Sequence, residues 1–213
     1  MHAVLPRFPI AEAFRQRATQ ILHAAPVDPM DHARRTGVAA AAGLPIDQHY
    51  LANAKPAAVL YPIVARPEGL SILLTERATH LNNHAGQVAF PGGRIEPGEA
   101  AHQAALREAQ EEIGLHPDLV APIGFLPTYY SGTGYRVQPL VGLVDPAATF
   151  RADPGEVARV FEVPLADALD LKRYRTSTIF WQGNERNFYI LDHDAAYIWG
   201  VTAGILRSFA ERY

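Results

Sequence analysis

Three glutamates gather in the stretch GRIEPGEAAHQAALREAQEEIGL (residues 93–115), where Glu108, Glu111 and Glu112 lie close together. Spacings of three and four place their side chains on one helical face, where like charges repel by roughly 0.2–0.5 kcal/mol per pair. Arg107, four residues before Glu111, is the single arginine on this stripe. A solvated helix face is one explanation. The other is a divalent cation between the carboxylates, and oxygen ligands suit Mg²⁺ or Mn²⁺.

The carboxylates need a rigid support, and their neighbours predict a helix over residues 99–113. Pro97-Gly98 interrupts the chain before this range, no helix breaker occurs within it, and Gly114 is a typical terminating residue. Before the helix, FPGG at residues 90–93 forms a turn whose backbone can approach a ligand closely. A helical wheel gathers three apolar residues on a separate face that can be buried: Leu106, Ala109 and Ile113.

The rest of the chain alternates between strand patterns and helix patterns, with no internal repeat. Helices are expected over residues 8–24, after Pro29, over 165–171 and over 201–213, and a linker over 35–56. Strands are expected over residues 56–66 and 70–77 (a hairpin), 119–130 and 135–144, 157–165, and 179–191 (a hairpin turning at Gly183-Asn184). Mixed strands with a few packed helices predict an α/β or α+β sandwich.

Composition narrows the classes of function. The chain has 213 residues, 48% of them hydrophobic and 19% charged, which suits a globular core. Its net charge of −3 gives no excess of basic residues, which argues against a dedicated nucleic-acid-binding protein. The absence of cysteine excludes disulfides, thiolate metal sites and a cysteine nucleophile. No signal peptide pattern and no long apolar run is present, so we expect a cytoplasmic protein that does not span a membrane.

From Gly93 onward the sequence resembles the Nudix box, G-x5-E-x7-R-E-U-x-E-E-x-G-U. The matching residues are Gly93, Glu99, Arg107, Glu108, Glu111, Glu112, Gly114 and Leu115, with the small Ala109 where a larger aliphatic residue is usual. The resemblance implies an α/β/α Nudix sandwich with a mixed sheet, and hydrolysis of a nucleoside diphosphate linked to another group. The expected organisation is an N-terminal helical extension over residues 1–54 followed by a Nudix domain over 55–213.

The resemblance also implies roles for the box residues. Glu108 and Glu112 are the leading metal ligands, and Glu111 is a further ligand or the acceptor of a proton. Arg107 orients a carboxylate, and the carbonyl of Gly93 completes a metal shell. Glu99 fits a structural role at the helix start, where the helix dipole favours an acid, as well as a catalytic one.

Upstream of the box, LLTERATHLNNHAGQVAFPGG is similar to the motif L-L-T-x-R-[SA]-x3-R-x3-G-x3-F-P-G-G of the coenzyme A pyrophosphatase subfamily. The second arginine of the motif is replaced by Asn82. The matching residues are Leu73, Leu74, Thr75, Arg77, Ala78, Gly86, Phe90, Pro91, Gly92 and Gly93. The implied reaction cleaves coenzyme A or an acyl-coenzyme A into 3′,5′-ADP and 4′-phosphopantetheine or its acyl form.

Within this resemblance, three residues are expected to bind substrate. Arg77 and Arg136 are candidates for a phosphate, because a guanidinium makes paired charge-assisted hydrogen bonds, although an ion pair would also explain Arg77. Gly92 lets the backbone approach the substrate. Glu156, in a polar loop after Pro154-Gly155, is a candidate general base.

Other interpretations remain open at this stage. The substrate is expected to be a small nucleotide, with ADP-ribose or another nucleoside diphosphate derivative as the alternative to coenzyme A. A Nudix module that senses a nucleotide without cleaving it is disfavoured, because all three box carboxylates are present. His80 and His84 are four residues apart but lack a third ligand at a usual spacing. A homodimer is compatible with the sequence.

Overall fold

The computed structural model describes residues 9–27, 39–40, 48–81, 84–181 and 184–213. The first half contains α1 (Pro9–Ile21), β1 (Ala39–Ala40), α2 (Gln48–Asn53), β2 (Lys55–Arg66), β3 (Gly69–Arg77), β4 (Val88–Ala89), β5 (Gly92–Arg94) and α3 (Ala101–Ile113). The second half contains η2 (Pro117–Leu119), β6 (Val120–Phe125), β7 (Tyr129–Tyr130), β8 (Tyr135–Val144), β9 (Val157–Pro164), α4 (Leu165–Leu169), η3 (Leu171–Arg173), β10 (Tyr174–Trp181), β11 (Asn184–Leu191), β12 (Ile198–Trp199) and α5 (Gly200–Ala210).

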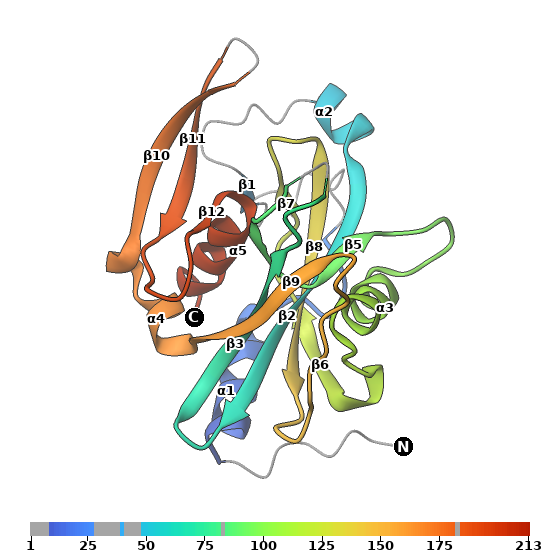
Figure 1. Cartoon of the computed structure of the whole chain (residues 1–213), viewed down its shortest axis with the longest axis vertical. Coiled ribbons are helices and arrows are strands. Elements are labelled where there is room, and N and C mark those ends of the chain that lie inside the picture. Colours follow the sequence, from blue (N-terminus) through green and yellow to red (C-terminus); the bar gives the residue numbers. More distant parts are fainter. Residues whose placement is uncertain (1–8, 28–38, 41–47, 82–83, 182–183) are drawn as a thin grey trace.

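Strands β2 and β8 form the centre of a mixed sheet. They run parallel from Lys55↔Tyr135 to Val64↔Val144, and both are almost continuously apolar, as expected for strands covered on both faces. On one side β8 pairs with β6 and β7, and β7 pairs with β1. On the other side β2 pairs with β3, which pairs with β4 and β9. A separate antiparallel sheet of β10, β11 and β12 lies beside α5 (Figure 1).

Two helical layers cover the main sheet, because side chains alternate between the faces of each strand. Ala58, Leu60 and Val64 of β2 pack in one cluster with the alanines of α3. Tyr61 and Ile63 point the other way, into a cluster with α1 and α5. Figure 1 shows α3 on one side of the sheet and α5 on the other. The α/β/α sandwich with a mixed sheet and an N-terminal helix is therefore confirmed.

Strands β2 and β3 separate at one end of the sheet, and the chain that leads into α3 fills the fork. Their pairing extends from the turn only as far as Ile63↔Ile72. Beyond this point β5 pairs with β2 while β4 pairs with β3. The link between β4 and β5 crosses the fork, and the carbonyl of Pro91 accepts a hydrogen bond from the Leu60 N–H at 2.8 Å. This crossing places the residues before α3 between β2 and β3.

Most expected elements are present, with differences in detail. The hairpin of β2 and β3, strand β8 and the C-terminal helix are confirmed. The expected linker contains β1 and α2 in its described parts. The helix predicted after Pro29 and the turn residue Gly183 lie outside the described residues. None of the helices in the described ranges is both long and apolar enough to cross a membrane.

Helix α3 differs from its prediction at both its start and its buried face. It begins at Ala101 rather than at residue 99, and Gly114 ends it with a left-handed φ of 67°. Leu106, expected to be buried, is only partly so. The buried face is instead made by small side chains together with one acid: Ala101, Ala104, Ala105, Ala109, Ile113 and Glu112. The alanines let the helix pack closely on β2.

Candidate active site

Glu112 is a buried carboxylate with few compensating partners. Its side chain is 5% exposed. The Gly92 N–H donates to its Oε2 at 3.1 Å, and Nη1 of Arg77 lies 3.8 Å from its Oε1, beyond hydrogen-bonding distance. Burial raises the pKa of Glu112 to about 7, a shift that the Gly92 N–H and Arg77 oppose and that the charges of Glu108 and Glu156 reinforce. Glu112 is therefore a buried acid with too little positive charge near it to stabilise its ionised form.

Glu108 lies one turn earlier on α3 and faces the backbone of β5. A Cβ on Gly93 would overlap the Glu108 carboxylate, so only glycine fits at this position without moving it. Burial raises the pKa of Glu108, while a hydrogen bond from Arg107 lowers it and the charges of Glu111 and Glu156 raise it. The Gly93 backbone and the Glu108 carboxylate are thus in contact, as they must be if both are to bind the same ion.

Arg107 links three carboxylates around the start and middle of α3. Its guanidinium donates to Glu99 at 2.8 Å, to Glu108 at 2.9 Å and to Glu111 at 3.0 Å. It also donates to the carbonyl of Arg94 at 3.2 Å, which fixes the helix to the end of β5. The side-chain hydrogen bond from Arg107, followed by the Glu96 N–H, lowers the pKa of Glu99. Glu99 is therefore a structural partner of Arg107 in this arrangement.

The three glutamates of the stripe occupy different environments. The Glu111 side chain is 58% exposed, that of Glu108 is 17% exposed, and that of Glu112 is almost wholly buried. Arg107 neutralises the outer two but makes no contact with Glu112. The repulsion predicted from the sequence is thus relieved at the surface of α3 and remains at its buried edge.

The loop before β9 brings a fourth carboxylate to this region. Backbone hydrogen bonds of 2.9 Å run from the Asp153 N–H to the Glu112 carbonyl and from the Arg151 N–H to the Ile113 carbonyl. The carbonyl of Glu156 accepts from the Ala78 N–H at 2.8 Å. The loop is thereby held between the end of α3 and the end of β3. The exposed Glu156 lies near enough to act electrostatically on both Glu108 and Glu112.

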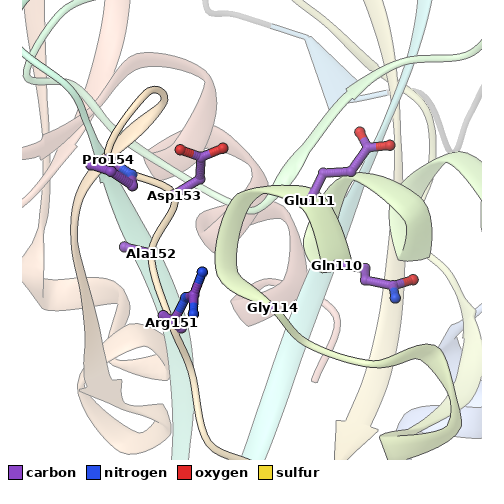
Figure 2. Close-up of a pocket in the computed structure, with 7 residues that line it drawn as sticks. All are labelled: Gln110, Glu111, Gly114, Arg151, Ala152, Asp153 and Pro154. Carbon is purple, nitrogen blue, oxygen red and sulfur yellow. The ribbon is translucent and has the colours of Figure 1, made fainter.

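Asp153 was not identified from the sequence, although it shapes this loop. Its Oδ1 accepts from the Gly155 N–H at 2.8 Å, and its carbonyl accepts from the N–H groups of Glu156 and Val157. The Asp-Pro-Gly sequence is a turn signal that could have revealed it. Asp153 and Glu111 line one hollow of about 340 Å³, and Figure 2 shows their side chains on opposite sides of it. Its lining does not include Glu112 and consists of Gln110, Glu111, Gly114, Arg151, Ala152, Asp153 and Pro154.

The two arginines expected to bind phosphate both have spare hydrogen-bonding capacity. The Nε atoms of Arg77 and Arg136 are buried without a hydrogen-bond partner among the described residues. An unpaired buried donor costs about 1–3 kcal/mol, which a bound anion would recover. Arg77 follows an irregularity in the pairing of β3 with β9, at the sheet end where β5 meets α3. The structure therefore brings Arg77 to Glu112, whereas among the described residues Arg136 forms no ion pair with a box carboxylate.

The two histidines four residues apart do not converge on a metal. Nε2 of His80 lies 3.2 Å from the Gly155 carbonyl, and Nδ1 of His84 lies 2.9 Å from Oε1 of Gln87. No group of three or more potential ligands close enough to hold a metal is found within the described ranges, so the carboxylates around Glu112 are not preassembled. Asn82 lies outside those ranges.

The donor set nevertheless fits a divalent cation. Glu112 is an acid buried with too little positive charge, Glu108 lies against the Gly93 backbone, and every available ligand atom is oxygen. Oxygen-only sites suit hard divalent ions such as Mg²⁺ and Mn²⁺. Carboxylates on a rigid helix beside Arg77, whose Nε is unpaired, suit metal-assisted chemistry on phosphate groups.

Comparison with known proteins agrees with this class. The NUDIX domain model matches residues 54–180. The chain is 48% identical over 159 residues to a protein of Escherichia coli (strain K12 / DH10B) named "Uncharacterized Nudix hydrolase NudL", covering 74% of this chain and 82% of that protein. A Salmonella paratyphi B protein of the same name is 47% identical over 163 residues, covering 76% and 84%. The chain belongs to the Nudix family and is a hydrolase of the pyrophosphatase type.

Solved structures similar to this one are more distant. A Nudix hydrolase from M. smegmatis, RenU, superposes with a TM-score of 0.45 at 22% identity, over 55% of this chain and 74% of that one. A C. elegans Ap4A hydrolase also gives a TM-score of 0.45, at 20% identity over 54% of this chain and 84% of that one.

Proposed function

We propose that this Nudix hydrolase cleaves the pyrophosphate bond of coenzyme A or an acyl-coenzyme A, giving 3′,5′-ADP and 4′-phosphopantetheine or its acyl form. The observation that carries the proposal is the position of Arg77. This arginine belongs to the motif that resembles the coenzyme A pyrophosphatase subfamily, and it lies 3.8 Å from Glu112 with its buried Nε unpaired. The subfamily motif and the Nudix box therefore meet in one site.

Nudix hydrolases generally use divalent metal ions, and we propose Mg²⁺ or Mn²⁺ held by Glu108, Glu112, Glu111 and the Gly93 carbonyl. When bound, such an ion stabilises negative charge on phosphate oxygens and acidifies water. Its charge would also lower the pKa of Glu112, because an adjacent cation favours the ionised carboxylate. Arg107 contributes by fixing the directions of the Glu108 and Glu111 carboxylates.

In this proposal the arginines hold the substrate and a carboxylate accepts the proton of the attacking water. Arg77 and Arg136 bind phosphate oxygens through their free Nε donors, and the Gly92 backbone lies against the substrate. Glu156 is the proposed base, because it is exposed and its backbone is held between α3 and β3. Glu111 is the second candidate, since it is exposed on α3, but its Oε2 already accepts a hydrogen bond from Arg107 at 3.0 Å.

A substrate screen tests the proposal directly. Purified protein would be incubated with Mg²⁺ or Mn²⁺ and with coenzyme A, acetyl-coenzyme A, ADP-ribose or NADH, and the products identified by mass spectrometry. We expect 3′,5′-ADP from the first two substrates. The Glu112→Gln variant is the matched control and should be inactive with all four. Turnover of ADP-ribose or NADH without turnover of coenzyme A would refute the proposed substrate.

The alternative within the family is hydrolysis of ADP-ribose or another nucleoside diphosphate derivative. It is favoured by one observation: Asn82 stands where the subfamily motif has a second arginine. Asparagine is shorter and uncharged, so it cannot make the bidentate contact with a phosphate. The substrate screen separates the two candidates.

We also propose that residues 55–213 form the hydrolase domain and residues 1–54 an extension to it. In the described part of that extension, α1 buries Ala11, Phe14 and Ala18 in the cluster that contains α5. Helix α1 is therefore packed against the rest of the fold.

A further inference from the structure

Three positive side chains come from three neighbouring strands at the end of the sheet where α3 begins. Lys55 is the first residue of β2, Arg94 is the last residue of β5, and Arg136 is the second residue of β8. The register places them within two positions of one another along β2, since Arg136 is opposite Pro56 and Arg94 is opposite Ala57. Lys55 and Arg94 lie on one face of the sheet, because Lys55 and Ala57 are two residues apart on β2, whereas Arg136 lies on the opposite face.

No carboxylate of the described residues lies within ion-pair distance of these three cations. Elsewhere in the described chain most arginines have such a partner. The pairs include Arg66 with Glu162, Arg159 with Glu76, Arg175 with Asp192 and Arg207 with Glu211. Positive charge is thus uncompensated at this one end of the sheet.

Lys55 and Arg94 both gather at the ring of Tyr135. Nζ of Lys55 lies 5.9 Å and Cζ of Arg94 lies 6.0 Å from the ring centroid, and the Arg94 Nη2 donates to the Tyr135 Oη at 3.2 Å. At an exposed site a cation–π contact contributes only about 0.5–1 kcal/mol. The ring therefore orients the two cations but does not neutralise their charge, and an anion between them would.

The position of this group relative to the carboxylates is set by the strands. Arg94 directly follows Gly93, which contacts the Glu108 carboxylate, and its own carbonyl is bonded to Arg107. Side chains alternate along β5, so Arg94 and Gly93 face opposite sides of the sheet. The Arg94 side chain is exposed at this strand end, and so is that of Lys55. The two cations therefore lie one residue beyond the Gly93 contact, on the other face of the same strand end.

We propose that Lys55 and Arg94, oriented by Tyr135, form a subsite for a second anionic group of the substrate, a phosphomonoester on the nucleoside. The subsite is separate from the one that binds the cleaved pyrophosphate, and the proposal rests on the nucleotide-hydrolase function argued above. A phosphomonoester carries a charge of about −1.5 to −2 at neutral pH, which matches two cations. The guanidinium supplies paired hydrogen bonds and the ammonium supplies a point charge.

Binding of two product-like nucleotides tests the subsite without requiring catalysis. Isothermal titration calorimetry of the full chain with Mg²⁺ would compare adenosine 3′,5′-bisphosphate with adenosine 5′-monophosphate. Charge-assisted hydrogen bonds contribute about 1.5–3 kcal/mol, so the bisphosphate should bind at least about tenfold more tightly. Lys55→Ala and Arg94→Ala should each remove most of this preference while changing the affinity for the monophosphate less than about threefold.

Lys172→Ala is the matched control, because Lys172 is an exposed cation at η3, and it should keep the full preference. If Arg94→Ala is unfolded by circular dichroism, Arg94→Gln, which keeps most of the side-chain stem, decides instead. Equal binding of the two nucleotides by the wild type, or an unchanged preference in both subsite variants, overturns the proposal. A bisphosphate preference without hydrolysis of coenzyme A would retain the subsite and refute only the proposed substrate.

Discussion

Replacing Glu112 by glutamine should stabilise the metal-free protein, and the gain should grow with pH. The folded chain holds the Glu112 proton up to a pKa of about 7, against an ordinary value of 4.5. Because the folded state binds the proton more tightly, the contribution of Glu112 to stability is greatest below pH 4.5 and is lost as the pH rises through 7. Between pH 5 and pH 8 this single group should lower the free energy of unfolding by about 2.5 kcal/mol.

The Glu112→Gln variant lacks this penalty, since the amide is uncharged and its oxygen can still accept from the Gly92 N–H. In EDTA, its melting temperature relative to wild type should therefore rise by about 5–10 °C between pH 5 and pH 8. Glu111→Gln is the matched control: it lies on the same helix with a side chain 58% exposed, and its melting temperature should follow wild type at both pH values. Parallel pH profiles for wild type and Glu112→Gln would show that burial does not hold a proton on this acid.

Four further substitutions probe the chemistry. Glu108→Gln should abolish most turnover and most of the melting-temperature increase caused by Mg²⁺ or Mn²⁺, with an unchanged circular dichroism spectrum; near-normal activity would exclude Glu108 as a ligand. Glu156→Gln should lower kcat by roughly 10²–10⁴-fold and affect metal affinity less than Glu108→Gln does; an effect below about threefold would leave Glu111 as the better base. Gly93→Ala should displace the Glu108 carboxylate and lower kcat by about 10²-fold, with little change in metal-free melting temperature; retention of full activity would show that the contact is unimportant. Asn82→Arg should raise kcat/KM for coenzyme A by at least about tenfold if this position contacts the substrate; equal effects on coenzyme A and its 3′-dephospho form would indicate a brace for the loop instead.

The acidic helix could be predicted from sequence because its information is local. The spacing of Glu108, Glu111 and Glu112 and the terminator Gly114 all lie within a few residues, and the helix ends where expected. The unequal burial of the three acids could not be predicted in this way. It depends on β5 lying against β2, which presents the Gly92 N–H to Glu112 and leaves Glu111 in solvent.

The same limit applies to the cations at the end of the sheet. Lys55 and Arg94 meet at Tyr135 because β2 runs parallel to β8 and β5 enters the fork between β2 and β3. Parallel pairing between segments far apart in sequence produces no periodic pattern in one amino-acid sequence, so it could not be predicted from this sequence alone. Arg77 was found only through its resemblance to a subfamily motif, and its approach to Glu112 follows from the irregular end of β3.

The face of the sheet opposite α3 is closed by parts of the chain that lie on either side of the family match at residues 54–180. Phe14 of α1 and Phe209 of α5 come from these two flanks, and their rings lie 6.1 Å apart. Phe209 lies 5.2 Å from Tyr61 in the middle of β2, and Thr202 donates to the carbonyl of Val88 in the fork. The family match therefore covers a shorter part of the chain than the packed core, which also includes α1 and α5. A fragment trimmed to the shared stretch would present a bare apolar sheet to water, so aggregation rather than a smaller working enzyme is the expected product of such trimming.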